Sequence, residues 1–128
     1  MAGNSLQKPS SPRRLSACLF DSLERRQLFS VVYTAQQVNT ATGPTFVASK
    51  DVNGDGRPDI VTANSTANKV SIILNTGDGT FAAATNYTVG NGPQSLAFAD
   101  FNSDGKLDII TANEFANTVS LLPGTGSG

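Results

Sequence analysis

The chain has 128 residues, of which 38% are hydrophobic and 15% charged, and its formal net charge is −1. This length suits one modest domain, and the abundance of Gly, Asn, Thr and Ser favours short strands and turns over helices. There is no His and a single Cys, which excludes Ser-His-Asp and Cys-His catalytic sites, His-ligated metal centres and an internal disulfide. No apolar run approaches the ~18–20 residues of a membrane span.

Charge is divided unevenly along the chain. Residues 1–42 carry a net charge of +3 and residues 43–128 a net charge of −4, with six of the eight acidic side chains of the second part in two short segments. Acidity concentrated in this way suits a cation site, and it leaves no basic patch of the kind that binds nucleic acid. We therefore expect no nucleic-acid partner and no membrane span.

The amino-terminal segment is polar at first and then weakly amphipathic. Residues 1–14 contain two prolines and predict disorder, and leucines at positions 15, 19 and 23 indicate a short helix. Leu15–Cys18 is similar to a lipoprotein cleavage box and Arg13-Arg14 to a twin-arginine signal, but both lack the apolar stretch of ~7–15 residues that such signals need. We predict a disordered leader over residues 1–28 with a possible short or capping helix.

A second resemblance in this region concerns export. Residues 20–30, FDSLERRQLFS, resemble the L-E-x-R-x-L-L-S segment near the start of many large bacterial surface proteins, departing from it at Phe29. The resemblance implies an extracellular or cell-surface location, with the export route left open.

The rest of the chain is an internal repeat. Residues 43–79 align without gaps to residues 92–128, with 19 identities in 37 positions. A period near 50 residues is typical of propellers and solenoids. We predict one complete unit over 43–91 and a second over 92–128 that ends before its last strand.

Each unit predicts short strands rather than helices, because β-branched and alternating apolar residues lie between Gly- and Asn-rich turns. The expected strands are Thr45–Lys50, Asp59–Ala63, Lys69–Leu74 and Phe81–Val89, then Gln94–Ala99, Asp108–Ala112 and Thr118–Leu122. Four short strands in about 50 residues make one blade of a β-propeller. We expect the phenylalanines to pack between blades: Phe81, Phe98, Phe101 and Phe115.

Residues 29–42 precede the first unit and look like a spare outer strand, belonging to a preceding or permuted blade. The predicted fold class is therefore all-β, with two antiparallel propeller-type blades in incomplete or permuted form. Two blades cannot close a ring, since propellers have at least about four. The open edges predict self-association, further repeats in a longer array, or a small open sandwich of two sheets.

The acidic segments are two copies of the pattern D-x-N-x-D-G-x-x-D, at residues 51–59 and 100–108. Ca²⁺ takes 6–8 oxygen ligands, and here oxygen side chains stand at positions 1, 3, 5 and 9, with a backbone carbonyl available at position 7. Gly56 and Gly105, at position 6, permit a sharp turn. Three carboxylates in nine residues repel one another unless a cation lies between them.

Three other kinds of loop have similar sequences. An EF-hand needs a bidentate Glu at position 12 and flanking helices, whereas Thr62 and Thr111 occupy that position in strand-like sequence. Dockerin-type loops also need an acid there. The remaining alternative is an Asx-rich turn without metal, held by bonds from side chain to backbone.

The loops, together with the Gly-rich turn before an aromatic residue at 74–81 (LNTGDGTF), resemble the FG-GAP or VCBS repeat of integrin-α-like propellers. The resemblance covers residues 43–128 and implies about two bound Ca²⁺ ions. By resemblance the ligands are Asp51, Asn53, Asp55, Arg57 (carbonyl) and Asp59 in the first loop, and Asp100, Asn102, Asp104, Lys106 (carbonyl) and Asp108 in the second.

These features predict a non-enzymatic calcium-binding repeat module of an extracellular or cell-surface protein, serving as an adhesion or interaction scaffold for an unknown protein or glycan ligand. The alternative is a calcium-dependent, lectin-like propeller fragment that uses the Asn-rich turns at 64–68 and 113–117. Against sugar stacking stand the absence of Trp and the presence of only two Tyr. An enzyme would need paired carboxylates outside the loops, for which Asp78 and Glu114 are the only candidates within the repeats.

Overall fold

The computed structural model describes residues 32–127. Close contacts divide the chain after Gln36, and every described strand lies in the unit that begins at Gln37. The leader and helix predicted over residues 1–28, with Cys18, lie outside the described residues. No helix of the described part is long and apolar enough to cross a membrane.

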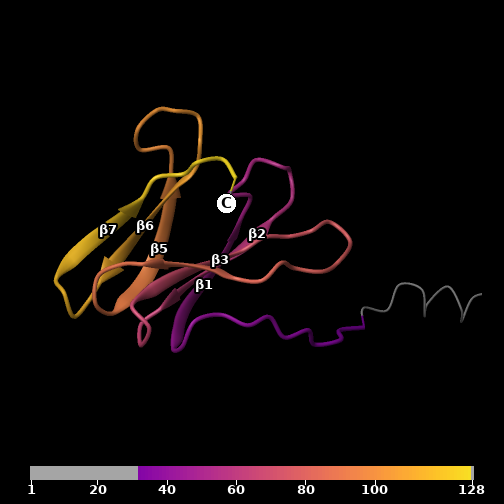
Figure 1. Ribbon diagram of the computed structural model, residues 1–128, viewed down its shortest axis with the longest axis horizontal. Coiled ribbons are helices and arrows are strands. Elements are labelled where there is room, and N and C mark those ends of the chain that lie inside the picture. The colour runs from indigo at the N-terminus through magenta and orange to yellow at the C-terminus, as the bar shows by residue number, and fades with distance from the viewer. Residues whose placement is uncertain (1–31, 128) are drawn as a thin grey trace, which may run out of the picture. The chain divides into compact units, whose positions relative to one another are not determined.

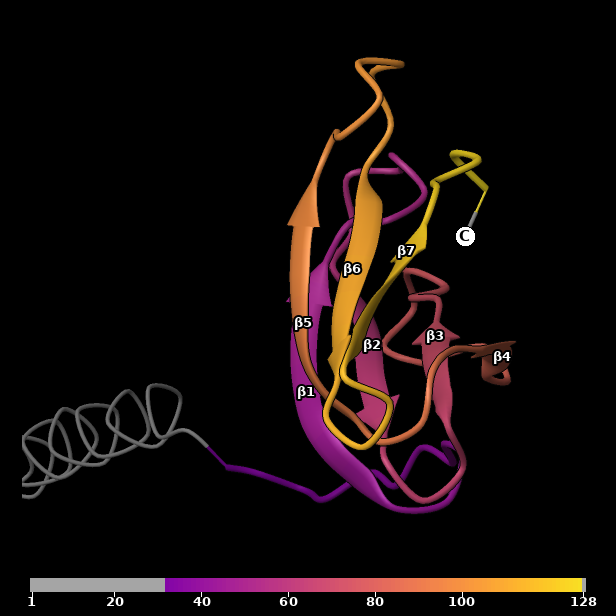
Figure 2. The same ribbon diagram turned by 90° about the vertical axis from the view of Figure 1, so that its left-hand side faces the viewer.

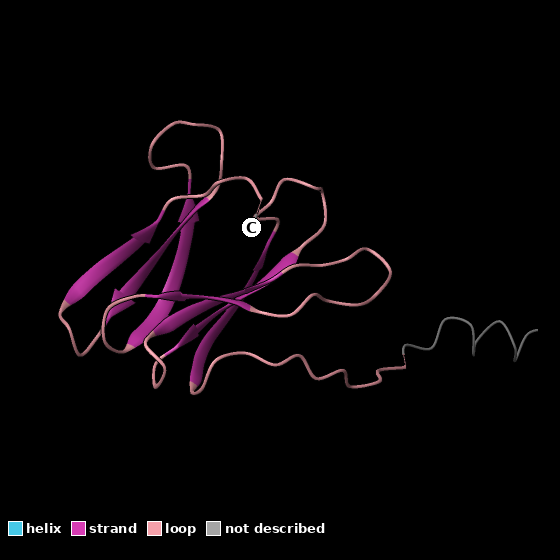
Figure 3. Ribbon diagram, in the orientation of Figure 1, coloured by secondary structure: helices cyan, strands magenta, loops and turns pink. Residues whose placement is uncertain are grey.

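The unit that begins at Gln37 is all-β, as predicted, and it consists of two antiparallel sheets (Figures 1 and 3). The first has the order β1-β2-β3-β4 and the second β5-β6-β7, so that within each sheet every strand pairs with the next along the chain. The strands are β1 (Pro44–Lys50), β2 (Asp59–Asn64), β3 (Lys69–Ile73), β4 (Thr85–Thr88), β5 (Pro93–Ala99), β6 (Asp108–Asn113) and β7 (Thr118–Leu122).

The two sheets repeat one another in detail. β1 pairs with β2 in the register Lys50↔Asp59, and β5 pairs with β6 in the register Ala99↔Asp108, 49 residues later. Both pairs carry an irregularity at the same point, between positions 44 and 46 and between positions 93 and 95. The gapless sequence repeat is therefore a structural repeat, with the bulge included.

The second sheet packs face to face on the first, and β5 lies beside β1 (Figure 2). The core between them combines Val61, Val70 and Ile72 of the first sheet with Ile109 of the second, all at most 7% exposed. Leu96, Phe98, Leu107 and Leu122 of the second unit cover this cluster. The interface thus buries one face of each sheet, which carries Val70 in the first sheet and Ile109 in the second.

The fourth strand of the first unit is shorter than predicted. β4 covers Thr85–Thr88 rather than Phe81–Val89, and before it only a single bridge joins Phe81 to Asn75. The turn at 75–80 closes on itself through Thr76, whose hydroxyl and amide bond the Thr80 carbonyl. These local bonds hold the backbone in a turn and keep residues 81–84 out of the sheet.

The outer strand expected over residues 29–42 is not formed by residues 32–42, which belong to no strand. β4 already occupies the free edge of β3, and β7 pairs with β6 alone among the described residues. The end of this segment instead bonds across the first sheet, with the Ala41 amide donating to Ser71 Oγ (3.3 Å). Gly90 makes the same bond to Ser120 Oγ (3.1 Å). Residues 40–43 thus repeat the connection that leads into the second unit.

Candidate metal centre

The two acidic segments form the loops that join β1 to β2 and β5 to β6. Each loop is the connection of an antiparallel hairpin, so its first and last residues are held by a strand pair. At position 6 the backbone turns through φ 82° at Gly56 and 80° at Gly105, which is the left-handed region that glycine allows. The loop form predicted from the glycine is confirmed in both units.

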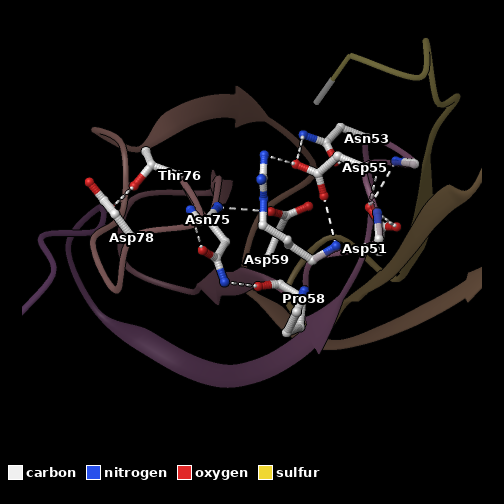
Figure 4. A network of polar contacts seen from close by, with 12 residues as sticks. Asp51, Asn53, Asp55, Pro58, Asp59, Asn75, Thr76 and Asp78 are labelled. Carbon is white, nitrogen blue, oxygen red and sulfur yellow. Dashed lines mark hydrogen bonds and ion pairs between the residues drawn. The ribbon is translucent and has the colours of Figure 1, made fainter.

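The carboxylate at position 1 lies on the inner side of the first loop. Asp51 Oδ1 accepts hydrogen bonds from the amides of Gly54 (2.8 Å) and Asp55 (3.1 Å), and Oδ2 accepts one from Gly56 (2.7 Å). Such amide dipoles stabilise negative charge. The loop is therefore curled around the Asp51 carboxylate (Figure 4).

Positions 3 and 5 of the first loop lie against each other. The Asn53 amide group donates to Asp55 Oδ2 (3.2 Å), and the Asp55 amide donates to Asn53 Oδ1 (3.2 Å). Asp55 Oδ1 accepts the amide of Arg57 (2.8 Å), while Oδ2 also pairs with the Arg57 guanidinium (3.0 Å). The pKa of Asp55 is lowered, chiefly by the hydrogen bond from the Arg57 amide.

The carboxylate at position 9 is buried in each unit. Asp59, 0% exposed, accepts the amides of Val52 (3.0 Å) and Asn75 (2.9 Å), as Figure 4 shows in part. Asp108, 1% exposed, accepts those of Phe101 (2.9 Å) and Gly124 (2.6 Å). The Gly124 amide, more than any other group, lowers the pKa of Asp108.

This pair of bonds ties three parts of each unit together. One oxygen holds the start of the loop, and the other holds the second residue after the third strand of the unit. The sequence indicated an acid at position 9 only as a ligand, and nothing in the pattern pointed to its second role as a clamp. The signal was the spacing of 16 residues from Asp59 to Asn75, which has no meaning until β2 and β3 are paired.

The second loop repeats the first with three differences, one of which is that the Ser103 amide does not bond Asp100 as the Gly54 amide bonds Asp51. Asp100 accepts the amides of Asp104 (3.1 Å) and Gly105 (2.8 Å), and Asp104 accepts that of Lys106 (2.8 Å). Lys106, however, makes no ion pair with the loop, unlike Arg57. Ser103 stands where the first loop has Gly54 and adopts the same left-handed conformation, with φ 60°.

The oxygen donors suit a hard divalent cation, but the acids are not gathered into a closed cluster. Among residues 32–127 no group of three His, Cys, Asp or Glu side chains lies close enough together to hold a metal ion. The hydrogen bonds expected of a metal-free Asx-rich turn are present. A carboxylate oxygen that accepts one amide retains a second lone pair.

One cleft of the described residues lies between the two sheets and reaches both loops, at Val52 and Leu107. It has a volume of about 490 Å³ and is lined by Tyr87, Leu107, Ile109, Leu122 and their neighbours. No Asp, Glu, Lys, Arg or Cys lines it. The cleft therefore offers an apolar lining without an acid–base pair.

The chain was compared with protein families, curated proteins and solved structures. The model of the FG-GAP-like repeat matches residues 51–111, from the first residue of the first acidic loop to β6, just beyond the second. No curated protein and no solved structure matches the chain significantly. The resemblance predicted from the two loops is confirmed over this range, where residues 51–111 match the FG-GAP-like repeat.

Proposed function

We propose that the chain is a non-enzymatic, calcium-binding repeat module of an extracellular or cell-surface protein, acting as an adhesion or interaction scaffold. The observation that carries this proposal is the repetition of one loop geometry. In both units an Asp at position 1 lies inside the curl, Asn and Asp at positions 3 and 5 touch, and a buried Asp closes the loop. All side-chain donors are oxygens, which Ca²⁺ prefers.

In this proposal the ligands are the ten residues named above. Asp51, Asn53 and Asp55 would supply side-chain oxygens in the first loop, and Arg57 its carbonyl. The carboxylate of Asp59 would orient the loop through its two amide bonds and contribute a remaining lone pair. A bound ion would offset the repulsion among the carboxylates and staple the hairpin.

The affinity expected of such a module is weak, on the order of 10⁻⁴–10⁻³ M, as for other extracellular calcium sites. At a free calcium concentration about ten times Kd, each site adds roughly 1.4 kcal/mol to the free energy of unfolding. Two sites then raise Tm by on the order of 10 °C for a unit of this size. In an extracellular location, where calcium is millimolar, each site would be about half to nine-tenths occupied over this range of Kd.

The lectin-like alternative has no observation in its favour. It would use the Asn-rich turns, but Asn64 and Asn113 are 0% and 2% exposed. The Asn64 amide group donates to Ser71 Oγ (2.8 Å), and Asn68 accepts the amide of Gly92 (2.9 Å). These groups stabilise the fold and are not free to bind a sugar.

The proposal of a non-enzymatic role rests on the carboxylates outside the loops, which are already bonded within the fold. The two carboxylates of the repeats outside the loops are engaged separately, Asp78 with the hydroxyls of Thr76 and Thr80 and Glu114 with Gln94 (2.8 Å). They form no acid–base pair, because they occupy turns of different units.

The test is thermal unfolding of the wild-type chain and of Asp55→Ala/Asp104→Ala, each in EDTA and in millimolar calcium. The wild type should gain on the order of 10 °C from calcium, and the double variant should lose most of that gain. The matched control is Asp78→Ala, which lies outside both loops and should keep the full gain. An equal gain in the double variant would defeat the ligand assignment.

A further inference from the structure

Equivalent side chains on one face of the two sheets differ in their exposure to solvent. On one face of the first sheet Val61, Val70 and Ile72 are at most 7% exposed, because the second sheet covers them, while Phe46 at the edge of that face is 40% exposed. The same face of the second sheet carries the equivalent side chains, 49 residues later. There Val119 is 61% exposed and Leu121 is 50% exposed.

The equivalence of these faces follows from strand pairing. Val70 lies opposite Ala63, and Val119 lies opposite Ala112; Ile72 lies opposite Val61, and Leu121 lies opposite Ile110. The loop residue beside this face behaves in the same way, since Val52 is 6% exposed whereas its counterpart Phe101 is 50% exposed. A face built to be covered in the first unit is thus open in the second.

The structure also shows what kind of surface covers such a face. The covering surface is the opposite face of a repeat of this same sequence, which carries Leu96 and Ile109 of the second unit. Their counterparts in the first unit are Val47 and Ile60. Val47 is 66% exposed and Ile60 is half-buried, whereas Ile73 on the same face is 2% exposed, so the covering face is open at this end of the two-sheet unit in the part around Val47.

A polar contact follows the same pattern. Across the intramolecular interface, Asn68 Oδ1 accepts the amide of Gly92 (2.9 Å). The equivalent of Asn68 is Asn117, with the same left-handed backbone (φ 57° and 53°), and the equivalent of Gly92 is Gly43. The side-chain amide of Asn117 has no hydrogen bond within residues 32–127. A second copy placed by the same rule would bring its Gly43 amide to Asn117.

We propose that the open face of the second sheet, around Val119 and Leu121, binds the first sheet of a second copy of this chain, around Val47, in a head-to-tail contact that repeats the packing between the two sheets. The contact joins two different surfaces, so it propagates until the rotation closes a ring. Propellers have about four to eight blades, which corresponds to about two to four copies. This inference rests on sheet packing and not on the calcium proposal.

The test uses sedimentation velocity of the wild-type chain, Val119→Lys, Val47→Lys and a control, Ala83→Lys, in the same calcium-containing buffer. Residues 119, 47 and 83 are exposed, so the substitutions leave the core intact, and circular dichroism with a thermal melt confirms the fold of each variant. The wild type and Ala83→Lys should associate as concentration rises, and Val119→Lys and Val47→Lys should each be monomeric.

The decisive sample is an equimolar mixture of Val119→Lys and Val47→Lys. Each variant retains the surface that the other lacks, so the mixture should form a dimer and nothing larger. A wild-type chain that stays monomeric at about 1 mM, where even a millimolar contact is populated, would overturn the proposal. So would self-association that Val119→Lys abolishes and Val47→Lys leaves unchanged, because that result indicates a face that binds itself or another partner.

Discussion

The buried carboxylate at position 9 gives the sharpest stability prediction. Asp59 is 0% exposed and accepts two backbone amides, from Val52 at the start of the loop and Asn75 after β3. In Asp59→Asn one oxygen keeps an amide bond, while the new NH₂ group faces the other amide as donor against donor. One buried N–H then loses its acceptor, which costs about 1–3 kcal/mol, and the loss of the charge-assisted bond adds to this cost.

We therefore expect Asp59→Asn to lower the free energy of unfolding by about 2–4 kcal/mol. The assay is urea denaturation followed by far-UV circular dichroism, in EDTA, so that the loss of a metal ligand does not contribute. Asp55→Asn is the control, since Asp55 is also a predicted ligand but is exposed and bonds only within its own loop. If the two variants lose the same stability in EDTA, the clamp assigned to Asp59 is wrong.

Three further predictions concern single side chains. Arg57→Gln removes the ion pair with Asp55 (3.0 Å), and an exposed pair of this kind is worth at most about 1 kcal/mol. We therefore expect the calcium affinity of the first loop, measured by calorimetry, to rise by up to about fivefold. An unchanged or lower affinity would contradict this. Thr40→Val removes the hydroxyl that bonds Thr62 Oγ1 (2.6 Å) and Asn64 Oδ1 (3.0 Å). This change should lower the free energy of unfolding, measured by urea denaturation, by about 1–2 kcal/mol. An unchanged free energy would mean that water replaces the hydroxyl. Hydrogen bonds from Thr80 and Thr76 lower the pKa of Asp78 from its ordinary value of 3.8 to about 2. The contribution of Asp78 to stability is therefore complete above pH 3.8 and is lost as the pH falls towards about 2. Asp78→Asn should flatten the stability profile in that window, and an unaltered profile would refute the assignment.

The sequence was a good guide to the fold wherever the pattern was local. Strand periodicity, the turn residues and the 49-residue repeat predicted six of the seven strands to within one residue at each end. These signals are local because a strand with one covered face must alternate, and a tight loop must place glycine where φ is positive.

The differences arise where tertiary context decides. The segment 29–42 was predicted to be an outer strand from its likeness to the fourth strand of the first unit. No sheet edge receives its described part, residues 32–42, and pairing partners cannot be read from the segment itself. The phenylalanines divide in the same way. Phe98 packs against the core, whereas Phe101 and Phe115 are exposed, because no strand among residues 32–127 packs on that side of the second sheet.

The candidate site shows the same limit. The loop pattern predicted which residues lie together, and positions 1, 3 and 5 do. The pattern could not indicate that both oxygens of Asp59 bond backbone amides, one of which lies beyond β3. Nor could it indicate that Arg57 forms an ion pair with Asp55 while Lys106 forms none with Asp104. These contacts depend on strand register and on side-chain length.

The central claim is that each acidic loop binds one calcium ion, and isothermal titration calorimetry tests it most directly. The wild-type chain should take up two Ca²⁺ ions with Kd on the order of 10⁻⁴–10⁻³ M. Asp55→Ala and Asp104→Ala should each take up one, and the variant carrying both substitutions none. No heat of binding to the wild type at millimolar calcium, or an unchanged stoichiometry in the single variants, would contradict the account.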